Sequence, residues 1–136
     1  MKPSITVSWL DLERIERLLD RLPAAQAGAR DALFDELGRA DMVEPWEMPS
    51  DVVSMNSRVR FCFAGAEEEE FTLTLSYPKD MQDDGEQVSV LTPVGTALLG
   101  LRIGDSIAWQ RPGGGDFVVT VLGIEYQPER AGELHR

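Results

Sequence analysis

The sequence predicts an α+β protein: a short N-terminal antiparallel helical hairpin (a coiled coil), followed by an antiparallel sheet that carries one short helix. In the N-terminal part, apolar residues recur three or four positions apart, which is typical of amphipathic helices. From Val53 onward they recur at every second position, which is typical of strands with one face on a core. One strong helix signal, at residues 92–100, lies between the alternating segments. The 136 residues, 43% of them hydrophobic, suffice for one domain or one domain with an appendage.

The first helix is predicted at residues 9–22. Ser8 is a suitable N-cap, and Asp11 places a negative charge in the first turn. Pro23 ends the helix, because the residue before a proline avoids the helical region. One face carries the apolar stripe Leu12, Ile15, Leu19 and Leu22.

A second helix is predicted at residues 29–41, with an apolar stripe of Ala29, Leu33, Leu37 and Ala40, widened by Phe34. Two short amphipathic helices bury their stripes most simply against each other, which favours a projecting antiparallel hairpin. The alternative is a pair of helices that lies flat on the main core. Residues 44–50 form a linker that Trp46 can anchor by burial. The predicted organisation is therefore a hairpin at 1–43, a linker at 44–50 and a second domain at 51–136.

The second domain alternates between apolar and polar residues, as antiparallel strands do. The polar side of the first strand carries Ser54, Asn56, Arg58, Arg60 and Cys62. The apolar positions are Val53, Met55, Val59, Phe61 and Phe63, then Phe71, Leu73, Leu75 and Tyr77, then Val88 and Val90, then Ile107 and Trp109, and finally Phe117, Val119 and Val121.

The short helix has signals at both ends. Thr92 is a good N-cap, Pro93 suits the first helical position, and Gly100 suits the position after the helix. Val94, Ala97 and Leu98 share one face, so this helix crosses the sheet with that face on the core.

Charge and cysteine content narrow the possible functions. The 13 Lys and Arg residues against 24 Asp and Glu residues give a formal charge of −11, which argues against a free-standing nucleic-acid binder and against binding to anionic membranes. An acidic surface of this kind binds a basic patch on another protein more readily than it binds nucleic acid or an anionic membrane. One cysteine, no apolar run of membrane-spanning length and no signal-peptide pattern at the N-terminus lead us to expect a cytoplasmic protein.

No residue pattern predicts catalysis, a cofactor or a metal site. The one histidine, His135, lies beside the C-terminus, and Cys62 has no neighbouring base. The acidic turn at residues 80–85 fails as a calcium loop, because Gln82 stands at the third position, where the motif has Asp or Asn, and Leu91 stands where a bidentate Glu is needed. Glycines 113–115 lack the Lys-Ser/Thr of a phosphate loop. We therefore expect a protein that is not an enzyme.

Several segments resemble the Gre family of bacterial transcript-cleavage factors. LTPVGTALLGLRIGD at residues 91–105 resembles the family's segment around the short helix, and PGG at residues 112–114 matches its glycine turn. MPSDVVSMNSRV at residues 48–59 and EYQPE at residues 125–129 are closer still to the Rnk group of Gre relatives, regulators of nucleoside diphosphate kinase.

The resemblance implies an FKBP-like domain at 51–136 and a coiled coil before it. It also implies binding to RNA polymerase near the secondary channel, with contact to the channel rim by Thr92, Pro93 and Val94, and more weakly by Leu98. Each of these also has a structural explanation, as a cap, a first turn or a core residue. We expect a monomer that competes with Gre-type factors, reaches DNA only through polymerase, and affects nucleoside diphosphate kinase levels indirectly.

The hairpin tip departs from the cleavage factors of the family, which carry an acidic pair there. LPAAQAG at residues 22–28 has no carboxylate, and Asp20 and Asp31 only flank it. Because Mg²⁺ needs oxygen ligands at fixed geometry, such a tip cannot complete a metal site. The alternative function is a peptidyl-prolyl isomerase of FKBP-like fold, with Trp109, Phe117 and Tyr126 around an apolar cleft, although cross-strand packing explains these three more simply.

Overall fold

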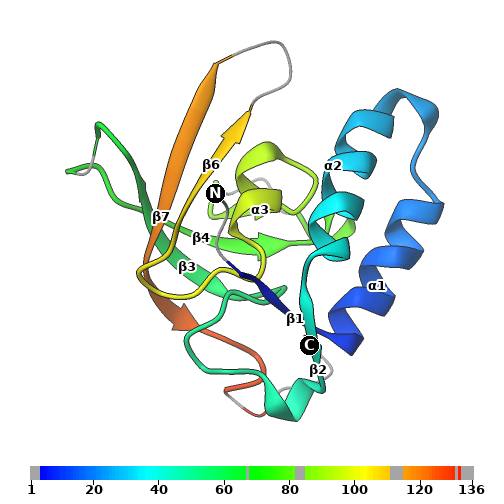
Figure 1. The fold of residues 1–136 in the computed structure, drawn as a ribbon, viewed down its shortest axis with the longest axis horizontal. Helices are drawn as coiled ribbons and strands as arrows, with labels where there is room; N and C mark the ends of the chain where they lie inside the picture. Colours follow the sequence, from blue (N-terminus) through cyan, green and yellow to red (C-terminus); the bar gives the residue numbers. More distant parts are fainter. Residues whose placement is uncertain (1–3, 67, 82–84, 111–114, 131, 133–136) are drawn as a thin grey trace.

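A computed structural model of the chain describes residues 4–66, 68–81, 85–110, 115–130 and 132. Its main sheet has five strands in the order β5-β4-β3-β7-β6. Figure 1 shows the sheet on one side, helices α1 and α2 side by side on the other, and helix α3 between them. The predicted α+β class is confirmed.

The hairpin forms where the sequence predicts it, with shorter helices. Helix α1 runs over Trp9–Asp20, and the Ser8 Oγ accepts a hydrogen bond from the Asp11 backbone N–H at 3.1 Å, so the predicted cap is confirmed. A 3-10 turn, η1 (Ala24–Gln26), leads into α2 (Ala27–Gly38). The predicted second helix is thus shifted toward the N-terminus and lacks its last turn.

A small parallel sheet that the sequence did not predict ties the two ends of the hairpin together. Strand β1 (Thr6–Ser8) pairs with β2 (Asp41–Val43). The Asp41 N–H donates to the Ile5 carbonyl at 2.9 Å, and the Thr6 N–H donates to the Gly100 carbonyl at 3.2 Å. The hairpin is therefore fixed at its base to the segment that follows α3.

The five-stranded sheet is mainly antiparallel, as predicted, with one exception. Its strands are β3 (Arg58–Phe63), β4 (Phe71–Ser76), β5 (Gln87–Ser89), β6 (Ser106–Gln110) and β7 (Asp116–Tyr126). Strand β5 runs parallel to β4, after the 3-10 turn η3 (Pro78–Asp80). Alternation of apolar residues reports which side chains face the core and carries no information on strand direction.

One core runs through both halves of the chain. Ile5, Ile15 and Leu33 from the N-terminal half belong to the same buried cluster as Val59, Leu75, Leu98 and Val119. Helix α2 also contacts α3 (Pro93–Leu98). The apolar stripes of the hairpin therefore pack on the main core, as in the alternative weighed above, while residues 23–26 at the tip stay exposed.

The structure corrects the predicted burial of four side chains: two that were expected to be buried are exposed, and two that were expected to be exposed are buried. Phe34 is 62% exposed on α2, and Trp46, on the 3-10 turn η2 (Pro45–Glu47), is 71% exposed, so it does not anchor the linker. Ser54 and Cys62, both assigned to a polar face, are buried. No helix within the described ranges is long and apolar enough to cross a membrane.

Candidate partner-binding site

The turn that precedes α3 is held by a compact set of hydrogen bonds. The Thr92 Oγ1 accepts from the Gly95 N–H at 3.0 Å and donates to the Ser89 carbonyl at 2.7 Å. The Thr92 N–H donates to the same carbonyl at 3.1 Å, and the Leu91 N–H donates to the Ser89 Oγ at 3.1 Å. The predicted N-cap is confirmed, and the cap orients Pro93 and Val94 by rigid local bonding.

Two glycines of the same segment are fixed by close packing. A Cβ on Gly95 would overlap the Ser89 carbonyl group, and one on Gly100 would lie 2.7 Å from the Ile5 Cβ. Gly100 also has φ +83°, a conformation that favours glycine. Glycine at these two positions therefore allows α3 to pack closely against the end of β5 on one side and against the chain at the start of β1 on the other.

The four residues predicted to bind polymerase divide into two groups. Thr92, Pro93 and Val94 are half-buried and keep part of their surface at the edge of the molecule. Leu98 is fully buried in the core cluster, so its role is to pack the core. It has no exposed surface with which to contact a partner. The surface that this turn presents therefore comes from Thr92, Pro93 and Val94.

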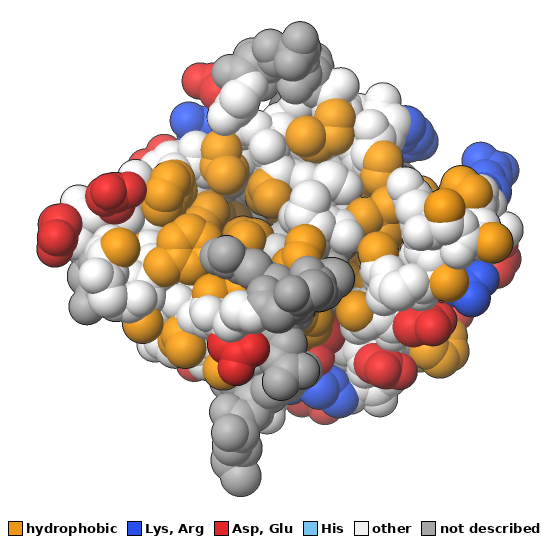
Figure 2. Space-filling model, turned by 90° about the horizontal axis from the view of Figure 1, so that it is seen from above, with side chains coloured by type: hydrophobic (Ala, Val, Ile, Leu, Met, Phe, Trp, Pro, Cys, Tyr) orange, Lys and Arg blue, Asp and Glu red, His pale blue; other side chains and the backbone are white. Residues whose placement is uncertain are grey.

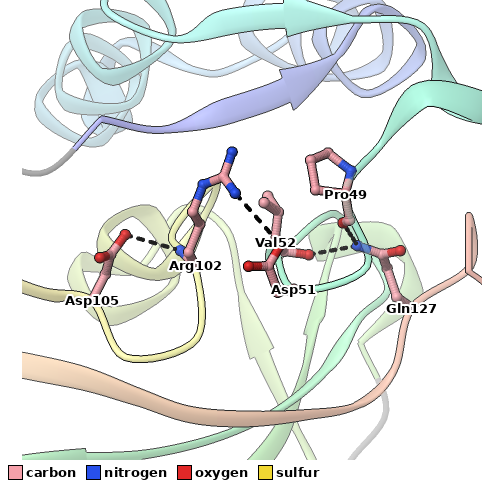
Figure 3. A network of polar contacts seen from close by, with 6 residues as sticks. All are labelled: Pro49, Asp51, Val52, Arg102, Asp105 and Gln127. Carbon is pink, nitrogen blue, oxygen red and sulfur yellow. Dashed lines mark hydrogen bonds and ion pairs between the residues drawn. The ribbon is translucent and has the colours of Figure 1, made fainter.

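The segments that resemble the Rnk group meet in space although they lie far apart in the chain (Figure 3). The Gln127 side-chain N–H₂ donates to the Pro49 carbonyl at 2.8 Å and to the Val52 carbonyl at 2.7 Å. The Ser54 Oγ donates to Glu129 Oε1 at 2.7 Å. Residues 125–129 thus hold residues 48–59 in place, partly by hydrogen bonding to backbone carbonyls that would otherwise lack a partner.

The segment after α3 joins the same network. The Val53 N–H donates to the Leu101 carbonyl, and the Gly100 N–H donates to the Val53 carbonyl, both at 2.8 Å. Arg102 lies 3.6 Å from Asp51 in an exposed ion pair (Figure 3). All three family-like segments therefore stabilise one another and the base of α3.

A buried carboxyl group links the hairpin to this region. Asp11 Oδ2 accepts from the Met55 backbone N–H at 3.1 Å, and the side chain is almost fully buried. Burial, followed by the nearby charge of Glu129, raises the pKa of Asp11 to about 7, although the Met55 N–H and the charge of Arg14 act in the opposite direction. The sequence indicated only a helix-start residue here, and no local pattern signals the long-range bond to Met55.

The tip of the hairpin carries no acidic pair. Pro23, Ala24, Ala25 and Gln26 are exposed, with Asp20 and Asp31 on the flanking helices. Within the described ranges, no three His, Cys, Asp or Glu side chains are grouped so that they could hold a metal ion. The PGG turn at residues 112–114 and His135 lie outside the described residues.

The aromatic residues considered for an isomerase cleft pack across strands. Trp109 and Phe117 are neighbours on β6 and β7 and are both buried. The Phe117 ring lies edge-on to Phe63, with centroids 5.7 Å apart. Tyr126 is half-buried at the end of β7. This arrangement gives no support to the isomerase alternative.

Comparison with known proteins gives a consistent picture. Residues 48–126 match the model of the C-terminal part of the GreA/GreB transcription elongation factors, and residues 3–43 match the Rnk N-terminus model. A regulator of nucleoside diphosphate kinase from Escherichia coli (strain K12) is 51% identical over 97% of this chain and 96% of its own length. A transcription elongation factor GreA from a Nitratiruptor species is 31% identical over 71% of this chain and 58% of its own.

A solved structure has the same fold. A GreA/GreB-type elongation factor from Nitrosomonas europaea is 50% identical, and the match covers 92% of this chain and 100% of that one with a TM-score of 0.72. The sequence resemblance is therefore confirmed across both halves of the molecule. The chain belongs to the GreA/GreB family of transcription elongation factors, in the group of the Rnk regulators of nucleoside diphosphate kinase.

Proposed function

We propose that the protein is a non-catalytic regulator of transcription elongation that binds RNA polymerase near its secondary channel. Thr92, Pro93 and Val94 contact the channel rim, and the hairpin at residues 1–43 points toward the channel. The observation that carries the proposal is the combination of a rigid, partly exposed turn before α3 with a hairpin tip that has no carboxylate. A chain of this kind occupies the site of a Gre-type factor and competes with it, without supplying metal ligands.

Size and charge support this proposal. A helix of 12 residues is about 18 Å long, so the hairpin is short, and it offers the channel its exposed tip at residues 23–26 while its apolar stripes stay packed on the core. The net charge of −11 suits basic patches on a large partner and speeds association more than it sets affinity. Figure 2 shows Asp and Glu side chains at several points around the edge of one face of the molecule. We further propose that the chain acts as a monomer with an FKBP-like domain at 51–136, and that any effect on nucleoside diphosphate kinase is indirect, through transcription.

Replacing Pro93 with aspartate is expected to lower co-purification with core RNA polymerase at least about tenfold. An acidic residue is favourable in the first turn of a helix, so α3 is expected to persist while the apolar contact is replaced by a charge. The measurement is recovery of core polymerase on the immobilised native chain and on the variant. Equal recovery on both, or none on either, would contradict the proposal.

The matched control is Pro45→Asp. Pro45 is also half-buried and begins a short helical turn, η2, outside the proposed contact surface. We expect this variant to recover polymerase as well as the native chain does. Circular dichroism of both variants checks that a lost interaction does not reflect a lost fold.

Addition of the protein to backtracked elongation complexes is expected to leave RNA cleavage at its intrinsic rate. The tip lacks the oxygen ligands that Mg²⁺ requires, so binding contributes no catalytic metal. Together with a cleavage factor of the family, it is expected to reduce the stimulated rate in a concentration-dependent way. Stimulation of cleavage by this chain alone would show that the interpretation of the tip is wrong.

A further inference from the structure

A pocket between α1 and the turn η3 has no role in the function proposed above. It encloses about 600 Å³, a size common among small-molecule sites. Helix α1 forms one wall, and the segment from Tyr77 to Asp80 forms the other, with Asn56 between them. Its lining residues are Arg14, Arg17, Leu18, Arg21, Asn56, Tyr77, Pro78, Lys79 and Asp80.

The periodicity of α1 explains the first wall. Arg14, Arg17 and Leu18 on α1 and Arg21 at its C-cap lie at intervals of three, one and three residues, so they lie along one side of the helix. Ile15 and Leu19, on another face, are buried in the core. Packing of the apolar stripe on the core therefore leaves three arginine side chains in the lining of the pocket.

The charge of the lining is opposite to that of the protein. Lys79 joins the three arginines, so the lining has four cations and one carboxylate, Asp80, in a chain with net charge −11. Arg17 also pairs with Glu13 at 2.6 Å in an exposed contact that a ligand can compete with. Such a lining attracts an anion.

The second wall contributes a buried polar group. The Tyr77 side chain is 5% exposed, and within the described part of the chain its hydroxyl has no hydrogen-bond partner. Burial, followed by the nearby charge of Asp11, raises the pKa of this hydroxyl, while the neighbouring Arg14 guanidinium acts in the opposite direction. A buried hydroxyl without a partner costs free energy, which a ligand oxygen at this position would recover.

The turn that carries Tyr77 is rigid. The Asp80 N–H donates to the Tyr77 carbonyl at 3.0 Å, and the Gln87 amide N–H₂ donates to the Asp80 carbonyl at 3.0 Å. Both walls of the pocket are therefore held in place by the fold before any ligand arrives, which lowers the entropic cost of binding.

We propose that this pocket binds a small phosphate-bearing anion of the di- or triphosphate class. Several cations converge on one cavity, as recognition of a multiply charged group requires, and arginine is well suited to phosphate oxygens. Leu18 and Pro78 supply apolar surface for the body of a phosphate ester. The site lies on the hairpin and η3, and Thr92, Pro93 and Val94 are not part of its lining, so it is independent of the proposed polymerase contact.

The test is calorimetric titration of the isolated full chain at low salt with three probes: pyrophosphate, ADP and adenosine. We expect ADP, pyrophosphate or both to bind with a Kd below about 1 mM, and adenosine not to bind. Tighter binding of ADP than of pyrophosphate identifies an ester as the ligand, and the reverse order identifies a free polyphosphate. Absence of binding by both phosphate probes, or binding of adenosine as tight as that of ADP, overturns the proposal.

Variants of the lining locate the binding. The double variant Arg21→Gln with Lys79→Gln is expected to weaken binding at least about tenfold, since it removes two of the four cations. Tyr77→Phe is expected to weaken binding without lowering thermal stability, because it removes only a hydroxyl that has no hydrogen-bond partner among the described residues.

Arg30→Gln, on α2 and absent from the lining, is the matched control and is expected to bind like the native chain. An equal effect of Arg30→Gln and the double variant would overturn the proposal, because it would report net charge alone. Polymerase is absent from these titrations, so their outcome does not depend on the proposed function.

Discussion

Replacement of Gly95 by alanine is expected to destabilise the protein by about 3 kcal/mol or more, at the upper end of overpacking effects. A Cβ at this position would overlap the carbonyl oxygen of Ser89 and lie 2.8 Å from its carbon. Both are backbone atoms, so no side-chain rotation can relieve the overlap. The same carbonyl accepts two hydrogen bonds from Thr92, and moving it would weaken the cap of α3.

The measurement is urea unfolding of the native chain and of two alanine variants. Gly28→Ala is the matched control, because Gly28 lies in α2 with nothing within 4 Å of an added Cβ. Alanine is a better helix former than glycine, so this variant is expected to be unchanged or more stable by up to about 1 kcal/mol. Native-like stability of Gly95→Ala would mean that the Ser89 carbonyl group can move away from α3 at little cost.

The features that the sequence predicted correctly depend on local chemistry. Ser8 and Thr92 were identified as N-caps because a side-chain oxygen before an apolar stripe is a strong local signal, and both make the expected bond. The strands around Val59 and Val119 follow from alternation alone. The turn before α3 could be located from sequence for the same reason, whereas its proposed role in contacting polymerase comes from the resemblance to the Gre family.

The features that the sequence missed depend on distant partners. Strands β1 and β2 have three residues each, too few for any period to be visible, and they form because Ile5 and Gly100 meet. Ser54 looked like a solvent-facing residue, but it is buried against Ser57 and Glu129. Glu36 is a local exception: it is buried although charged, and it pairs with Arg39, three residues on, through bonds of 2.8 and 2.7 Å. The burial of a polar residue that has a long-range or ionic partner cannot be predicted from its hydropathy.

The same distinction explains the pocket and the exposed aromatic residues. The arginines of α1 share a helical face that can be read from spacing, but the opposing wall at Tyr77 comes from a segment more than fifty residues away. The sequence predicts Phe34 on the apolar stripe of the second helix and Trp46 as an anchor of the linker, yet both side chains are largely exposed. Each residue type has an average preference for burial, but the topology of the fold determines whether a particular side chain is buried.

The stability of the native chain is expected to fall relative to that of Asp11→Asn as the pH rises from about 4 to about 7. Burial raises the pKa of Asp11 from 3.8 to about 7 in the folded protein. In this window the folded state keeps a proton that the unfolded state has released. Each pH unit therefore lowers the free energy of unfolding by up to about 1.4 kcal/mol, and the loss ends above about pH 7.

Asparagine is the informative substitution because it keeps an oxygen that can accept the Met55 N–H but cannot ionise. Unfolding in urea at several values between about pH 4.5 and about pH 8 gives the difference between the two proteins, with Asp35→Asn as an exposed control that should follow the native chain. The difference should change by a few kcal/mol across the window and stay constant above it. A constant difference at every pH would mean that Asp11 is already charged in the folded protein. The hairpin would then be anchored to Met55 by a carboxylate, and its attachment to the sheet would not depend on pH in this range.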